Sequence, residues 1–108
     1  MPADGSLRSI LAGDPDMAAL IKLFVSELPQ RMEALQIAWR KGEYDNVRRA
    51  AHQLRGSSAG YGFPAIGTAA GIIDDTLRTK GSRDEKVLGG VASQIEELQS
   101  LCRRARAG

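Results

Sequence analysis

Apolar residues recur at steps of three and four along almost the whole chain, which is the spacing of one face of a helix. Sustained two-residue alternation, the pattern typical of half-buried strands, is absent from the sequence. The predicted apolar faces are formed, in chain order, by Met17, Leu20, Ile21, Phe24 and Leu28; by Met32, Leu35, Ala38 and Trp39; by Val47, Ala51, Leu54 and Ser58; by Ile66, Ala69, Ala70, Ile73 and Leu77; and by Val91, Ile95, Leu98 and Cys102. The pattern therefore predicts an all-α protein.

The predicted helices are separated by residues that start or stop helical structure. Asp14 followed by Pro15 begins the first helix, because Asp caps a helix and Pro is tolerated in its first turn. Pro29 then interrupts or kinks that helix. Further boundaries are expected at Lys41-Gly42, at Glu43, at Gly60-Tyr61-Gly62, at Phe63-Pro64, at Gly81, and at the capping box Ser82-Arg83-Asp84-Glu85. We predict an antiparallel four-helix bundle with an additional short N-terminal helix.

Length and composition fit one globular domain. The chain has 108 residues, of which 43% are hydrophobic and 26% are charged. A chain of this size can bury one modest core without a metal or a disulfide. We expect a single domain over residues 1–108, with the bundle at about 14–105 and flexible ends, including a frayed RRARAG tail.

Charge and cysteine content argue against several function classes. A net charge of +2 and an aromatic content of 5% do not favour nucleic-acid binding, which gathers basic and aromatic residues on one face. Cys102 is the only cysteine, so neither an internal disulfide nor a Cys–His metal set is available, and its place in an apolar stripe favours core packing. No apolar run approaches the roughly 20 residues needed to cross a bilayer, and the N-terminus lacks the features of a signal peptide. We expect a cytoplasmic protein with no nucleic-acid partner, no membrane partner and no metal site.

His52 is the only histidine, and its position on the predicted third helix favours a chemical role. At 100° per residue it lies roughly 140° from the centre of the apolar stripe, so we expect it to face solvent. The residues at neighbouring helical positions are Arg48, Arg49, Arg55, Gly56 and Ala59. An exposed neutral imidazole is an available nucleophile, and arginines beside it can hold anionic phosphoryl oxygens. This combination suits phosphoryl transfer, in which positioning and charge neutralisation dominate.

Gly56 adds to this interpretation, because a glycine inside a helix costs about 1 kcal/mol relative to alanine. Together with Ala59 it leaves a low strip of backbone beside the imidazole, over which another protein can approach. From spacing alone, a plain surface histidine on an arginine-rich face remains an alternative. A glycine inside a helix also occurs where two helices pack closely.

The run Ala51-His52-Gln53-Leu54-Arg55-Gly56-Ser57-Ser58-Ala59-Gly60-Tyr61-Gly62 resembles the signature of histidine phosphotransfer (HPt) domains of bacterial multistep phosphorelays. That signature is His, any residue, an aliphatic, Lys or Arg, Gly, two small residues, and a further Gly a few positions on. The resemblance covers roughly residues 14 to 102. Departures from the family pattern are Glu43 in place of Asp, Asp74 in place of Glu, and Phe63-Pro64 at the start of the next helix.

The resemblance implies that Nε2 of His52 takes a phosphoryl group from the aspartyl phosphate of a receiver domain and passes it to another response regulator. It implies that Arg55 corresponds to the basic residue beside the phosphohistidine and that Gly56 lets the receiver dock, with Arg48 and Arg49 at the edge of a surface around Ala59. The expected partners are receiver domains of response regulators or of a hybrid histidine kinase. The chain itself is then a monomeric carrier without a nucleotide site, a kinase activity or a cofactor, and the Mg²⁺ needed for transfer is held by the receiver.

Two alternatives are weighed against this interpretation. The dimeric phosphoacceptor domain of a histidine kinase also presents a helical histidine, but it typically follows that histidine with an acidic residue, whereas Gln53 stands here. The second alternative is a non-catalytic helical adaptor, or a weak nucleic-acid binder, in which the arginine cluster alone matters. It predicts partner affinity that falls steeply with salt.

Overall fold

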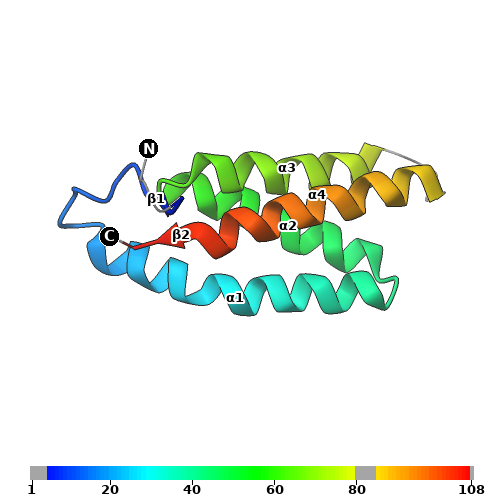
Figure 1. The fold of residues 1–108 in the computed structure, drawn as a ribbon, viewed down its shortest axis with the longest axis horizontal. Helices are drawn as coiled ribbons and strands as arrows, with labels where there is room; N and C mark the ends of the chain where they lie inside the picture. The colour runs from blue at the N-terminus through cyan, green and yellow to red at the C-terminus, as the bar shows by residue number, and fades with distance from the viewer. Residues whose placement is uncertain (1–4, 80–84, 108) are drawn as a thin grey trace.

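The computed structural model describes residues 5–79 and 85–107, which form four antiparallel helices (Figure 1). The elements are β1 Leu7–Arg8, α1 Ala18–Arg40, α2 Tyr44–Gly60, α3 Pro64–Thr79, α4 Glu85–Arg104 and β2 Ala105–Arg106. Each helix packs against the next along the chain, and α4 returns to α1. The most extensive contact is between α2 and α3. The predicted four-helix bundle is confirmed by this arrangement.

The core is made by the apolar faces of the four helices. Every predicted stripe residue of α2, α3 and α4 is buried, and Ser58 is buried with its apolar neighbours. At the end of the bundle where α2 turns into α3, Phe24 of α1 stacks on Tyr61 and Phe63, with ring centroids 4.9 and 5.7 Å apart. These rings fasten α1 to the turn that follows the histidine-bearing helix.

The prediction of an additional N-terminal helix is wrong. Pro29 lies inside α1, which runs without a break, and α1 begins at Ala18 rather than at Asp14. Pro29 is exposed, while Leu28 and Met32 on either side of it are buried. Packing of the flanking apolar residues therefore holds the helix together where the proline removes one backbone donor.

Two smaller differences concern the start of α1. The Asp14 carboxylate accepts a hydrogen bond from the Asp16 backbone N–H at 2.9 Å, so it stabilises a turn ahead of the helix instead of capping it. Leu20, predicted to line the inner face, is 46% exposed. Ile21 and Phe24 already fill the inner face of this turn of the helix, so Leu20 lies outside it.

The ends of the described chain meet in a two-residue parallel pair, β1 with β2 (Figure 1). The sequence predicted no strands and a frayed tail after residue 102. Both predictions are wrong, because Leu7–Arg8 pairs with Ala105–Arg106 and because Ala105 is only 3% exposed. Two residues are too few to produce an alternating pattern, and the partner strand lies almost a hundred residues away in the chain. The expected boundaries at Gly81 and at the capping box of Ser82 fall on residues 80–84, outside the described part of the chain.

The segment after β1 is fastened to the turn between α2 and α3. Ile10 donates its backbone N–H to the Gly62 carbonyl at 2.8 Å, and the Ser9 hydroxyl donates to the Tyr61 carbonyl at 2.6 Å. Gly62 is buried and has a φ of +84°, a conformation that residues with a Cβ rarely adopt.

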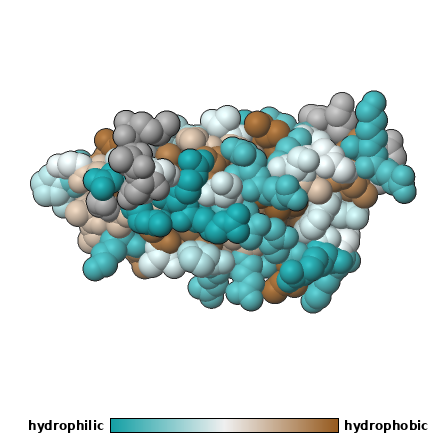
Figure 2. All heavy atoms as spheres, viewed as in Figure 1, coloured by the Kyte–Doolittle hydropathy of each residue, from teal (hydrophilic) through white to brown (hydrophobic). Residues whose placement is uncertain are grey.

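Figure 2 shows the molecule from the same side as Figure 1, and that surface is mainly hydrophilic with small, separate apolar areas. Within residues 5–79 and 85–107, no helix is both long and apolar enough to cross a membrane.

Gly62→Ala is expected to lower the free energy of unfolding by about 1–3 kcal/mol, because the new Cβ would collide with Ser9 Oγ and force a left-handed backbone on alanine. Gly60→Ala is the matched control, since a Cβ there meets nothing within 4 Å and the residue is helical. Chemical denaturation measures both variants. Equal stability of the two would contradict this account of the turn.

Candidate functional site

His52 lies on the outer face of α2, and its side chain is 60% exposed. The solvent-facing orientation predicted from helical spacing is thus confirmed. The buried face of α2 points the other way and is made by Val47, Ala51, Leu54 and Ser58. The imidazole is therefore held on a rigid helix while its ring remains accessible.

The residue that orients this ring is Asp74 of α3. Its Oδ2 lies 2.8 Å from His52 Nδ1, and its side chain is fully buried. Sequence reasoning named Asp74 only as a departure from a family pattern and gave it no role. A signal was present, because Asp74 lies four residues after Ala70 and three before Leu77, so it is a charged residue within an apolar stripe.

Three arginines surround the buried carboxylate. Arg48 Nη1 is 3.5 Å from Oδ1, while Arg55 Nη1 and Arg78 Nη2 are 3.5 and 3.8 Å from Oδ2. Among the described residues Oδ1 has no hydrogen-bond partner, and Arg48 contacts it as an ion pair. Burial raises the pKa of Asp74, but the His52 hydrogen bond, the positive charge of Arg78 and the contact with Arg48 outweigh it, and the pKa is held below its ordinary value.

The ionised carboxylate determines which ring nitrogen of His52 can react. A carboxylate without a proton only accepts hydrogen bonds, so Nδ1 of the neutral imidazole must carry the hydrogen. Nε2 is then the nitrogen with a free electron pair. The site thus presents one defined nucleophilic atom on an exposed ring.

Arg55 contacts a second carboxylate beside the first. Its Nη1 donates to Asp75 Oδ1 at 3.0 Å, and Arg78 Nη2 lies 2.6 Å from the same oxygen. The hydrogen bond and the charge of Asp75 raise the pKa of Arg55, and the hydrogen bonds from Arg78 and Arg55 lower the pKa of Asp75. Arg49 is not brought to this cluster, since its Nη1 lies 3.5 Å from Asn46 Oδ1 on the exposed side of α2.

Gly56 and Ala59 are both exposed on α2, next to His52 and Arg55. A Cβ at Gly56 would meet nothing within 4 Å, so close helix packing within this chain does not account for the glycine. Beside it, a groove of about 460 Å³ lies between α2 and α3 and is lined by Arg55, Ala59, Pro64, Gly67, Thr68, Gly71, Ile72 and Asp75. The surface next to the imidazole is therefore low and partly apolar, with charges at its edge.

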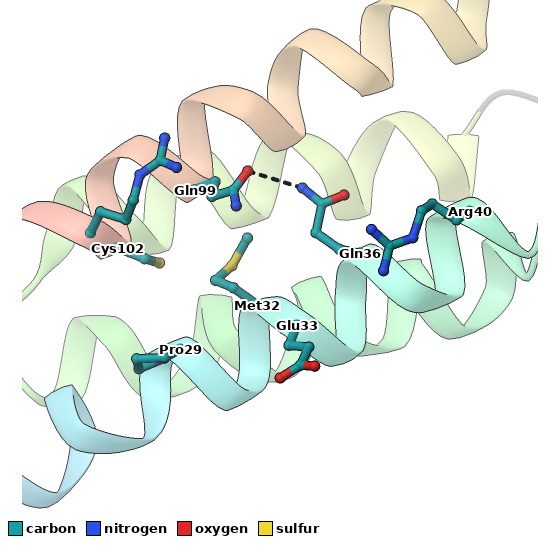
Figure 3. Close-up of a pocket in the computed structure, with 8 residues that line it drawn as sticks. Pro29, Met32, Glu33, Gln36, Arg40, Gln99 and Cys102 are labelled. Carbon is teal, nitrogen blue, oxygen red and sulfur yellow. Dashed lines mark hydrogen bonds between the residues drawn. The ribbon is translucent and has the colours of Figure 1, made fainter.

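A second cleft of about 440 Å³ lies between α1 and α4 and does not include His52. Figure 3 shows Met32 pointing from α1 toward α4 and the hydrogen bond that Gln36 Nε2 donates to Gln99 Oε1 at 3.0 Å. Cys102 lies in this cleft, and burial raises the pKa of its thiol to about 11. The core position predicted for Cys102 is confirmed. The described residues include no group of three or more His, Cys, Asp or Glu that could hold a metal ion.

The depressed pKa of Asp74 predicts how stability depends on pH. The unfolded chain binds a proton to this carboxyl more readily than the folded chain, so the stabilisation is present above the ordinary aspartate pKa of about 3.9 and is lost as pH falls below it. Asp74→Asn is expected to lower the unfolding free energy at pH 6 by about 1–3 kcal/mol, and this deficit shrinks toward pH 3. Denaturant unfolding across pH 3–7 measures it, with exposed Asp16→Asn as control. A deficit that stays constant across this range would contradict the assignment.

The model of a family described as Hpt domain matches residues 19–108, which include all four helices except the first residue of α1. No curated protein and no solved structure matches the chain. Because the family model matches well over half of the sequence, the chain belongs to the Hpt domain family, the histidine phosphotransfer modules of phosphorelays.

Proposed function

We propose that Nε2 of His52 accepts a phosphoryl group from the aspartyl phosphate of a receiver domain and passes it to the aspartate of another. The observation that carries the proposal is the hydrogen bond between His52 Nδ1 and the buried carboxylate of Asp74. It leaves Nε2 as the atom with a free electron pair, on a ring that is 60% exposed.

In the proposed step, the electron pair of Nε2 forms a bond to phosphorus while the bond from phosphorus to the carboxylate oxygen of the donor aspartate breaks. The electron pair of that broken bond stays with the leaving carboxylate. The imidazole gains positive charge as the N–P bond forms, because Nδ1 keeps its hydrogen. The negative charge of Asp74, 2.8 Å from Nδ1, stabilises this developing charge and fixes the ring orientation. The reverse step returns the phosphoryl group to a carboxylate.

The arginines have different parts in the proposal. Arg55 lies one helical turn after His52 on a similar side of α2 and contacts the same Asp74 oxygen, so we assign it to the phosphoryl oxygens. Arg48 holds the other Asp74 oxygen and contributes positive charge one turn before the histidine. Arg49 points to Asn46, so it adds only to the positive field at the edge of the docking surface.

We propose that the receiver docks over Gly56, Ala59 and the groove between α2 and α3. Small residues let its backbone come close to the imidazole, and exposed Ile72 offers an apolar contact within the same groove. Such an apolar centre with charged residues at the rim is typical of protein interfaces. In this proposal Mg²⁺ is bound by the receiver, and the chain is a carrier with no cofactor, kinase activity or nucleotide site. A cytoplasmic location is part of the proposal.

The dimeric kinase phosphoacceptor domain is less well supported. That domain builds its bundle from helices of two chains, whereas here α1 to α4 of one chain surround a common core. We therefore propose a monomer. The adaptor alternative gives no reason for a buried aspartate aimed at an exposed histidine.

Phosphoryl uptake tests the proposed role of His52. Wild type is expected to take acid-labile, base-stable label from at least one phosphorylated receiver domain in a panel, and His52→Gln is expected to take none. Circular dichroism of the variant checks that it folds. Uptake by His52→Gln, or no uptake by wild type from any receiver, would contradict the proposal. A steep loss of receiver binding with salt in both proteins would then favour the adaptor.

Asp74→Asn is expected to slow phosphoryl uptake at least about tenfold, by analogy with the ten- to hundredfold losses seen when a carboxylate that orients a metal-bound histidine is removed. Asparagine keeps the shape of the side chain but removes the charge that stabilises the ring. The measurement is single-turnover transfer from a phosphorylated receiver, with Asp16→Asn as the matched loss of an exposed aspartate. An unchanged transfer rate in Asp74→Asn would refute the electrostatic role.

A further inference from the structure

The resting position of Arg55 is determined by α3 as much as by its own helix. Its Nη1 donates to Asp75 Oδ1 at 3.0 Å and lies 3.5 Å from Asp74 Oδ2. The shorter contact is thus with Asp75, whose side chain is half exposed. In the unphosphorylated protein Arg55 is therefore already paired with a carboxylate.

Gly71 of α3 makes this position possible. A Cβ at this residue would lie 3.0 Å from Arg55 Nε, 3.2 Å from Cδ and 3.3 Å from Cζ. The end of the arginine side chain therefore lies directly over the backbone of Gly71, so close that a Cβ there would force it to shift by a few tenths of an ångström. Gly67, one turn earlier, faces the backbone of α2 at 3.4 Å or more and does not meet the Arg55 guanidinium.

From this position Arg55 is close to the reacting ring. Arg55 Nη1 and His52 Nδ1 both contact Oδ2 of Asp74. A phosphoryl group on His52 would add negative oxygens within the range of the same flexible side chain. The Asp75 carboxylate and the phosphoryl group then compete for the single guanidinium of Arg55.

We infer that Asp75 competes with the phosphoryl group of phosphorylated His52 for Arg55, and that Gly71 provides the path by which Arg55 reaches both. The inference rests on the proposed function and adds a determinant of its equilibrium. Because Asp75 holds Arg55 best when His52 is unmodified, it stabilises the unphosphorylated state. Because the two equilibria are linked, Asp75 lowers the stability of phosphorylated His52 relative to the unphosphorylated protein. It thereby favours onward transfer of the phosphoryl group. Asp75 and Gly71 are thus positioning residues that act through Arg55.

The test measures the equilibrium of phosphoryl exchange with phosphoramidate, which does not depend on finding a receiver. The bond from phosphorus to nitrogen in phosphoramidate breaks as the Nε2–P bond forms, and ammonia leaves with the electron pair. Phosphorus NMR at a fixed ratio of phosphoramidate to ammonium gives the phosphorylated fraction, approached from both directions.

Asp75→Asn is expected to raise the exchange equilibrium constant about two- to fivefold, the range corresponding to a partly exposed ion pair. Arg55→Gln is expected to lower it. In the Arg55→Gln background the effect of Asp75→Asn falls to less than half, because the residue it acts through is gone. Asp16→Asn controls for the loss of one negative charge.

Gly71→Ala is expected to shift Arg55 by a few tenths of an ångström and to reduce the effect of Asp75→Asn, by less than Arg55→Gln does. Gly67→Ala adds a methyl group to the same helix without meeting the guanidinium, so it should leave that effect unchanged. Far-ultraviolet circular dichroism verifies that each variant is folded.

The outcomes separate this inference from the proposed function. An equal effect of Asp75→Asn with and without Arg55, or no effect at all, overturns the competition even if receivers load His52 normally. Failure of every receiver to load wild type, with the coupling between Asp75 and Arg55 intact under phosphoramidate, overturns the receiver proposal and leaves the competition supported. A chain that phosphoramidate does not modify overturns the inference, because Nε2 would not be accessible.

Discussion

The hydrogen bond between His52 Nδ1 and the buried carboxylate of Asp74 is the interaction on which the rest of the site depends. It joins α2 to α3, leaves Nε2 as the ring nitrogen with a free electron pair, and places a negative charge beside the ring, where positive charge develops in the proposed transfer. It requires the two helices to approach closely. At Gly67 the two helices are close enough that an added Cβ would be in van der Waals contact with the backbone of α2, at 3.4 Å. The close packing of α2 against α3 therefore also determines which nitrogen of the His52 ring has the free electron pair.

A fully buried carboxylate is costly unless positive charge surrounds it. Here Arg48, Arg55 and Arg78 supply that charge from the surface, and each remains partly exposed. The arrangement leaves the anion in the protein interior and the cations at its edge. In the proposed transfer, a phosphoryl group arriving at His52 meets a positive rim, while the Asp74 charge is directed at the other side of the ring. The same arginines that make the buried aspartate tolerable also prepare the surface for an anionic group.

The glycines near the site illustrate that one residue type can act in different ways. Gly62 is needed for its backbone conformation in the turn after α2, and Gly71 for the space that the Arg55 side chain occupies. Gly56 meets neither requirement, since a Cβ there would enter open space. Its helical cost of about 1 kcal/mol is not recovered by any contact with the described residues, which is consistent with a surface kept low for a partner.

The sequence by itself determined the helical faces, the exposure of His52 and the ends of α2, because these follow from periodicity and turn residues that act over a few positions. Only the tertiary structure decided that Asp74 is the partner of His52, that α1 continues through Pro29, that Arg49 stays apart from the cluster, and that the chain ends pair as β1 and β2. Each of these depends on a side chain or a backbone far away in the sequence, or on packing that outweighs a local preference. Local spacing places a residue on a face, but the residue across from it is chosen by how the helices pack.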